Sequence, residues 1–111
     1  MDADVRIFDL QAELCQAMGH PVRLKIVYLL KEGPQRVMDI AQKMGVPQPA
    51  VSRHLAVLRH IGLVLTERQG LEVIYRIANP KIVAVCEMMR AVLSERETQR
   101  LEVLGALQHK R

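Results

Sequence analysis

The hydrophobic pattern between residues 37 and 61 predicts two short helices joined by a tight turn. The first apolar stretch, 37–44, stops at Gly45, where a positive φ angle costs little. Pro47 and Pro49 then open a second helix, at positions where a missing backbone N–H does least harm. This order of helix, glycine turn and proline-started helix predicts a helix-turn-helix. An ordinary helical hairpin inside an all-α core is the alternative interpretation.

The second helix of this pair has two different sides. Its apolar stripe follows the i, i+4, i+7 spacing and consists of Val51, Leu55 and Leu58. Its opposite side carries small or hydrogen-bonding residues: Pro49, Ser52, Arg53, Ala56 and His60. A helix with such a side can approach the floor of a DNA major groove. The pattern therefore favours a recognition helix.

After residue 61 the hydrophobic period changes from helical to extended. Residues 63–68 and 73–77 are rich in aliphatic and β-branched side chains, and Gly70 lies in the connection between them. A hairpin directly after a helix-turn-helix is the wing of a winged helix, here at about 63–77. Its tip, with Arg68 and Gln69, would lie over a phosphate backbone or minor groove. A ribbon that only covers the core is the alternative.

The flanking segments predict further helices at about 4–18, 21–30 and 80–107, the last with a polar run at 94–100. The first and last of these carry more apolar surface than a small winged helix can cover. We therefore expect a two-fold homodimer. Its expected interface residues are Phe8, Leu14, Ile82, Met89 and Leu93.

Length and composition predict one small domain, residues 1–111, with an aliphatic core. The chain is 50% hydrophobic but only 3% aromatic and has no Trp. The expected fold is mainly α with a small β wing: about five helices plus a β-hairpin. No apolar run reaches the roughly 20 residues of a membrane span, and the acidic start is unlike a signal peptide. We expect a cytoplasmic protein without a membrane partner.

Positive charge gathers where the helix-turn-helix and wing are predicted. The chain has a net charge of +4, and residues 35–76 carry six Lys or Arg against three Asp or Glu. Such an excess suits contact with the phosphates of double-stranded DNA, although many soluble domains show as much. An enzyme is not expected, since no nucleophile–base pair, acidic pair or glycine-rich phosphate loop stands out.

Three motifs in order resemble one known family over about residues 10–93. The segment 18–27, MGHPVRLKIV, is similar to the "hPxRLxIL" opening of the ArsR/SmtB repressors. The segment 49–55, PAVSRHL, resembles the family's recognition helix, and Gln69-Gly70 with 74–77, IYRI, resembles its wing. The resemblance implies dimeric winged-helix repressors that release a palindromic operator when an effector binds.

Carried over position by position, the resemblance implies a set of DNA-binding residues. Gln48, Ser52 and Arg53 would read bases, with Arg68 and Gln69 at the wing. For His54, at the flank of the helix, we favour a packing or phosphate role over a base contact. The full set of expected contacts is Gln48, Pro49, Ser52, Arg53, His54, Arg59, Arg68 and Gln69.

The metal sites of the family do not carry over, so neither a metal nor another cofactor is expected. The family's thiolate site falls on residues 36–39, where Arg36 and Met38 cannot replace cysteines. Its zinc-type site falls on Asn79, Lys81, Val92 and Glu95, and three of these four are chemically unfit.

Two cysteines, Cys15 and Cys86, lie on the helices expected at the dimer interface. They are interpreted first as small buried hydrophobic residues. The sharper alternative is a redox or persulfide switch that changes the angle between recognition helices. The persulfide-sensing members of the family place their thiols elsewhere, near Tyr28 and about one turn beyond Cys86. A two-thiol arsenic site is a weaker option.

The leading hypothesis for function is a sequence-specific transcriptional repressor that is released by an effector or redox signal. Two alternatives remain, an architectural or non-specific DNA-binding protein and a winged-helix module that binds proteins. The recognition face with Ser52 and Arg53 argues against the last. The effector, the operator sequence and the regulated genes stay open.

Overall fold

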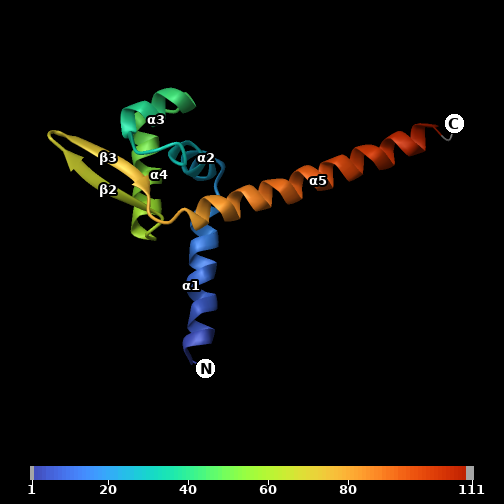
Figure 1. The fold of residues 1–111 in the computed structure, drawn as a ribbon, viewed down its shortest axis with the longest axis horizontal. Helices are drawn as coiled ribbons and strands as arrows, with labels where there is room; N and C mark the ends of the chain where they lie inside the picture. Colours follow the sequence, from blue (N-terminus) through green and yellow to red (C-terminus); the bar gives the residue numbers. More distant parts are fainter. Residues whose placement is uncertain (1, 110–111) are drawn as a thin grey trace. The chain divides into compact units, whose positions relative to one another are not determined.

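The computed structural model describes residues 2–109, and within them the side chains of residues 5–106. It divides into two compact units, 1–80 and 81–111. The expectation that both belong to one winged helix-turn-helix domain stays a prediction. The elements of the first unit are α1 (Asp2–Met18), α2 (Pro21–Leu30), β1 (Gln35–Arg36), α3 (Val37–Met44), α4 (Gln48–His60), β2 (Val64–Gln69) and β3 (Glu72–Ile77), and the second unit contains α5 (Lys81–His109) (Figure 1).

The core of the first unit is aliphatic, as the composition predicts. Helices α2, α3 and α4 and strand β2 supply its largest fully buried side chains, which are Ile26, Val27, Leu30, Ile40, Val51, Leu55, Leu58 and Val64. The predicted stripe of α4 is confirmed, because Val51, Leu55 and Leu58 have no exposed surface. Burying each such side chain contributes roughly 1.5–3 kcal/mol, so this stripe fixes α4 against the core.

Local signals set the helix boundaries of the first unit. His20 caps α2, because its Nδ1 accepts a hydrogen bond of 3.1 Å from the Val22 N–H, and Pro21 follows as the first helical residue. Helix α3 ends at Gly45, which has a φ of +65°, a left-handed conformation that suits glycine. Helix α4 starts after Pro47. The predicted turn between the two helices is confirmed.

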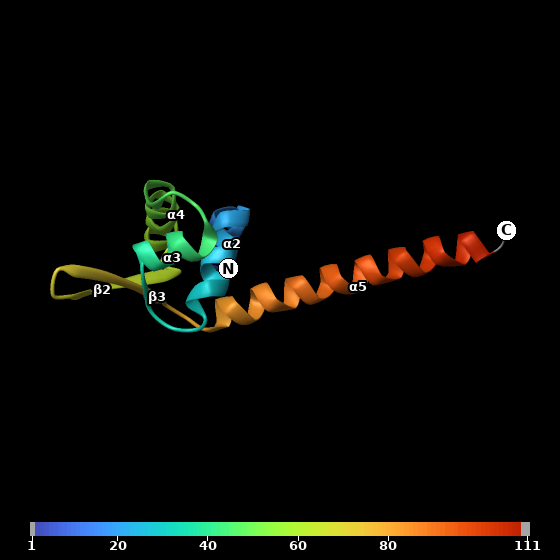
Figure 2. The same cartoon turned by 90° about the horizontal axis from the view of Figure 1, so that it is seen from above.

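The strands form a three-stranded antiparallel sheet in the order β1-β3-β2. The hairpin of β2 and β3 is the predicted one, but its turn is shorter than expected: Gln69 pairs with Glu72, leaving only Gly70 and Leu71 between. Strand β1 is not predicted by the sequence pattern; its residues Gln35 and Arg36 pair with Tyr75 and Ile74. The hairpin projects from the helices of this unit in both ribbon views (Figures 1 and 2).

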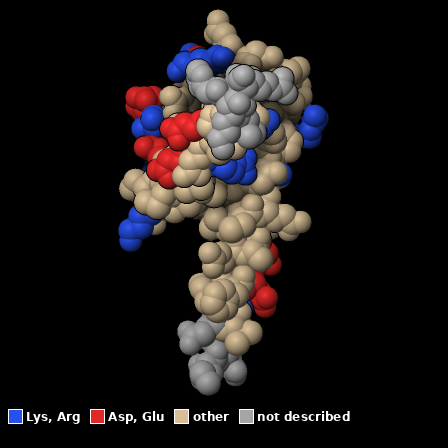
Figure 3. Space-filling view, turned by 90° about the vertical axis from the view of Figure 1, so that its right-hand side faces the viewer, with Lys and Arg blue, Asp and Glu red and all other residues tan. Residues whose placement is uncertain are grey.

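Helix α1 carries apolar side chains that the chain itself leaves uncovered. Val5, Ile7, Phe8 and Leu10 are between 48% and 69% exposed. The lower part of the surface in Figure 3, where α1 lies, is largely uncharged apart from acidic side chains along one edge. Exposed apolar surface of this extent is uncommon on a monomeric protein and usually marks an interaction site.

Helix α5 runs without interruption from Lys81 to His109, straight through the polar run at 94–100. Its exposed apolar residues before and after that run are Val85, Met88, Met89, Val92, Leu93, Leu101, Val103 and Leu104. A helix of 29 residues spans roughly 44 Å. Among the residues that the structure describes, no helix has the length and hydropathy needed to cross a membrane.

Candidate nucleic-acid interface

Helix α4 separates its two faces cleanly. The buried stripe packs in the core, while Gln48, Pro49, Ser52 and Arg53 are exposed on the other side. Arg59 is also exposed and lies in the last turn, where a positive charge complements the partial negative charge of the helix end. The core therefore holds α4 rigidly while its polar face stays accessible.

The wing residues expected at the DNA lie at the end of the hairpin. Arg68 and Gln69 are the last two residues of β2, both exposed, and they pair across the ladder with Val73 and Glu72. Gly70 takes a φ of +64°, which allows the two-residue turn. The turn leaves Leu71 entirely exposed. Arg68 thus stands on an accessible ribbon rather than under the core.

A small hollow of about 230 Å³ lies where the recognition helix and the wing come near each other. It is lined by Arg36, Val37, Met38, Gln48, Glu72 and Val73. These residues come from β1, from the start of α3, from the first residue of α4 and from the outer end of β3. The structure thus brings Gln48, an expected base-reading residue, to the same hollow as the wing.

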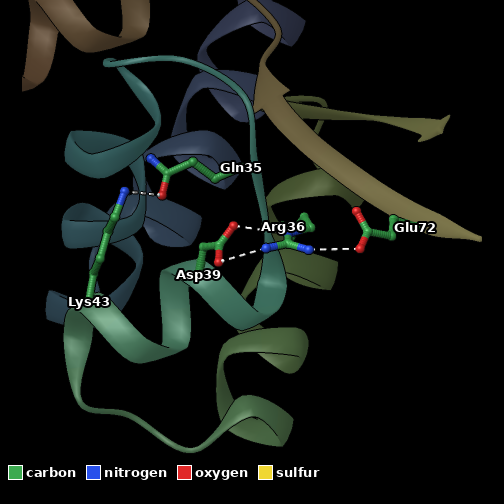
Figure 4. A network of polar contacts seen from close by, with 5 residues as sticks. All are labelled: Gln35, Arg36, Asp39, Lys43 and Glu72. Carbon is green, nitrogen blue, oxygen red and sulfur yellow. Dashed lines mark hydrogen bonds and ion pairs between the residues drawn. The ribbon is translucent and has the colours of Figure 1, made fainter.

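A cluster of charged and polar side chains, which the sequence pattern does not predict, lies beside this hollow (Figure 4). The Arg36 guanidinium donates to both Asp39 oxygens, from Nε to Oδ2 at 3.0 Å and from Nη2 to Oδ1 at 3.2 Å. Its Nη1 donates to Oε1 of Glu72 at 2.7 Å. Next to it, Lys43 Nζ donates to Gln35 Oε1 at 3.0 Å. The i, i+3 spacing of Arg36 and Asp39 was a readable signal, whereas Glu72 is 36 residues away.

The contacts in this cluster shift the pKa values of Arg36 and Asp39. The hydrogen bond from Arg36, with the nearby positive charges of Arg36 and Lys43, holds the pKa of Asp39 below its usual range. The two carboxylates in turn raise the pKa of Arg36, above all through their hydrogen bonds. Arg36 and Asp39 therefore stay charged at neutral pH.

His54 lies half-buried on α4, and its ring contacts that of His20 with the centroids 4.3 Å apart. Burial lowers the pKa of His54, and the charges of His20, Arg23 and Arg53 lower it further. This environment suits the packing role favoured from the sequence more than a contact with a base. A direct DNA contact by His54 stays a prediction.

The two cysteines have different environments. Cys15 is exposed on α1, whereas Cys86 is buried on α5. Burial raises the pKa of the Cys86 thiol, and the nearby Arg90 opposes this shift. A raised pKa leaves less of the reactive thiolate, which suits a packing role for Cys86. Cys15 is open on the single chain, and its burial at a dimer interface stays a prediction.

The residues expected at a dimer interface also differ in exposure. Phe8 is 69% exposed, and Met89 and Leu93 on α5 are almost half exposed. Leu14 is half-buried, and Ile82 is only 9% exposed, so Ile82 offers little surface to a partner. The exposed members are the ones able to contribute to an interface.

At the position of the family's thiolate site, the side chains present do not fit a metal. Arg36 is bound to both carboxylates near it, so Asp39 is already occupied by a cation. Among the described residues, no group of three or more His, Cys, Asp or Glu side chains is arranged to hold a metal ion.

The model of the arsR family of bacterial regulatory proteins matches residues 20–66 of this chain. The chain is 44% identical over 73 residues to the transcriptional repressor SmtB of Mycobacterium tuberculosis. That match covers 66% of this chain and 54% of SmtB, so the chain spans about half the length of this relative.

A second relative, the transcriptional repressor PagR of Bacillus anthracis, is 43% identical over 83 residues, which cover 73% of this chain and 82% of PagR. The crystal structure of PagR superimposes with a TM-score of 0.68 at 38% identity, covering 77% of this chain and 98% of that one.

A solution structure from Mycobacterium bovis, described as a homodimeric winged helix-turn-helix DNA-binding domain, superimposes with a TM-score of 0.77. The identity is 29%, and the match covers 86% of this chain and 88% of that domain. The fold is thus the predicted winged helix-turn-helix.

Proposed function

Because the chain belongs to the arsR family of bacterial regulatory proteins, we propose that it is a sequence-specific DNA-binding repressor of transcription. It acts in the cytoplasm as a homodimer on a palindromic operator. An effector or redox signal releases it. Relatives named as repressors, such as SmtB and PagR, support this role.

The observation that carries the proposal is the division of α4 into a buried and an exposed face. The stripe of Val51, Leu55 and Leu58 anchors the helix, while Ser52 and Arg53 stay exposed and ready for hydrogen bonds. Arginine reads guanine by donating two hydrogen bonds to its major-groove edge. A rigidly held helix with this face is what base reading requires.

The proposed contacts divide into two kinds. Gln48, Ser52 and Arg53 read base edges, with Pro49 beside them at the start of the helix. Arg59, Arg68 and Gln69 contact the phosphate backbone and the adjacent groove, and His54 supports α4 from its flank. Phosphate contacts fix the register of the protein on DNA but carry little sequence information.

Dimerisation is proposed from the uncovered apolar surface. The exposed side chains of α1 and α5, among them Phe8, Met89 and Leu93, need cover that the single chain does not provide. A two-fold dimer is the commonest solution, and it would place two recognition helices about one DNA turn apart. The homodimeric state of the M. bovis domain supports this arrangement.

The test compares two arginines on a defined operator. A binding site is first selected from random DNA, and affinity is then measured on this site, on single-base variants and on scrambled DNA. We expect Arg53→Ala to lose about 1–3 kcal/mol of binding free energy at one base position and little on scrambled DNA. Lys25→Ala removes a charge from α2, outside both contact elements, and serves as the control.

The alternatives give different results in the same assay. An architectural or non-specific binder would yield no enriched sequence, and Arg53→Ala would weaken all DNA equally. A protein-binding module would show no salt-dependent DNA affinity. Either result would overturn the proposed repressor function.

A further inference from the structure

Arg36 connects the helix-turn-helix to the wing through two sides of its guanidinium group. One side, Nε and Nη2, binds the two oxygens of Asp39 on α3, and the other, Nη1, binds Glu72 on β3. We call Arg36, Asp39 and Glu72 the guanidinium clamp (Figure 4). Asp39 orients the planar group, because a bidentate pair fixes its plane, and Glu72 accepts a hydrogen bond from the third nitrogen, Nη1.

The clamp contacts the wing beyond the last backbone pair between β1 and β3. The last backbone pair between β1 and β3 joins Arg36 to Ile74. From Ile74 toward the tip of the hairpin, β1 no longer pairs with β3. Glu72 lies two residues beyond Ile74 and pairs with Gln69, next to Arg68. The contact from Arg36 to Glu72 therefore extends the attachment of the wing to its outermost ladder pair.

The position of this contact matters because the hairpin acts as a lever. From Ile74 to Glu72 the strand spans about 7 Å, so a rotation of about 10° at Ile74 would move Glu72 by about 1 Å. A displacement of this size is enough to break a hydrogen bond or ion pair to a phosphate. By holding Glu72, the clamp limits this movement at the neighbouring Val73 and so at its ladder partner Arg68.

The clamp also lies at the hollow of about 230 Å³ between the wing and α4. Arg36 and Glu72 line this hollow together with Gln48, the first residue of α4. The clamp therefore lies where the start of the recognition helix faces the wing. Fixing the wing here also fixes the separation of the two DNA-contacting elements.

From these contacts we propose that Arg36 is a positioning residue for DNA binding: with Asp39 and Glu72 it sets the angle of the wing relative to α4. This proposal rests on the proposed DNA-binding function. Arg36, a cation, lies in the segment where the family's thiolate site would fall.

The proposal makes a prediction opposite in sign to simple electrostatics. Removing a negative charge beside a DNA-binding surface ordinarily strengthens binding, because repulsion from the phosphates falls. If Glu72 holds the wing in place, Glu72→Gln must weaken binding although it removes a negative charge. Glu67→Gln removes a carboxylate from the same hairpin, at a residue for which the described structure has no ion pair, and is the matched control.

The experiment measures operator affinity by fluorescence anisotropy at several salt concentrations. We expect Glu72→Gln and Arg36→Gln to weaken binding by about two- to fivefold, the size expected of an exposed ion pair. Glu67→Gln should bind as tightly as the wild type or tighter. Arg36→Lys should be intermediate, because one ammonium group cannot hold both carboxylates in the geometry of a guanidinium.

A second readout tests whether the effect travels through the wing. In an Arg68→Ala background, Glu72→Gln should cause no further loss, since the contact that it positions is gone. Without DNA, backbone amides of residues 65–76 should exchange faster with solvent in Glu72→Gln, while those of α4 stay unchanged.

The outcomes separate this inference from the proposed function. If Glu72→Gln binds like Glu67→Gln, or if its loss persists in the Arg68→Ala background, the clamp does not position the wing. If the wild type shows no sequence preference, the repressor function fails, but the exchange rates of the free protein still decide whether the clamp holds the wing.

Discussion

The rings of His20 and His54 lie 4.3 Å apart at an angle of 44°, and they join the start of α2 to the recognition helix. His20 caps α2 through its Nδ1, which must be unprotonated to accept the hydrogen bond from Val22. His54 lies between the exposed Arg53 and the buried Leu55. The pair therefore ties the placement of α4 to the cap at the start of α2.

Acidification should destabilise the fold through His54. Its pKa in the folded state is lowered by burial and by the charges of His20, Arg23 and Arg53. As pH falls through about 6.5, the pKa of His54 in the unfolded state, the unfolded chain binds a proton at His54 that the folded chain does not yet bind. The contribution of His54 to the free energy of unfolding is therefore fully present above this pH and declines below it.

Thermal unfolding between pH 7.5 and 5 measures this decline. His54→Gln should reduce the dependence of Tm on pH, whatever its effect on Tm itself. His60→Gln, at an exposed residue of the same helix, should keep the wild-type dependence. An unchanged pH dependence in His54→Gln would show that other groups govern acid stability.

The wing arginine should act on all DNA alike. Arg68 is exposed at the end of β2, where it can reach a phosphate. Arg68→Ala should lower affinity for operator and scrambled DNA by the same factor and reduce the slope of log K against log salt by about 1. A loss confined to the operator would instead make Arg68 a base-reading residue.

Met89→Asp should convert the dimer to a monomer. Met89 is 49% exposed on α5, and a buried methionine-sized side chain contributes about 1.5–3 kcal/mol to an interface. Desolvating a carboxylate there would oppose association. Sedimentation velocity should show a monomer, and operator affinity should fall at the same time. Gln99→Asp adds the same charge in the polar run of α5 and should remain dimeric.

The cysteines should pack rather than switch. Cys86→Ser places a hydroxyl at a buried position and should cost about 1–3 kcal/mol of unfolding free energy. Cys15→Ser, at an exposed position, should cost less than about 0.5 kcal/mol. Operator release by peroxide or polysulfide should be absent in the wild type. Release that appears in the wild type and disappears in both variants would establish a thiol switch.

Zinc, cadmium and arsenite should not release the protein through the family's usual sites. Arg36, Met38, Lys81 and Val92 stand where thiolate, imidazole or carboxylate ligands are needed. Titration with each metal, followed by operator binding, checks this. A stoichiometric site of sub-micromolar affinity that dissociates the DNA complex would contradict it.

Features that depend only on neighbouring residues could be predicted from the sequence alone. Gly45 ends α3 because a left-handed residue is needed there, and Pro47 and Pro49 fix the start of α4. The spacing of Val51 and Leu55 decided which face of α4 is buried, because that spacing repeats once per helical turn. Gly70 marked the turn of the hairpin for the same local reason.

Contacts between residues far apart in the sequence depend on the tertiary structure. Strand β1 is two residues long, so it has no periodicity to read, and its existence depends on the edge that β3 offers. The contact from Arg36 to Glu72 depends on the hairpin register, because a shift by one residue turns a side chain to the other face. The contact of His20 with His54 likewise needs α2 and α4 packed together. Long-range contacts of this kind follow from packing, which no local pattern encodes.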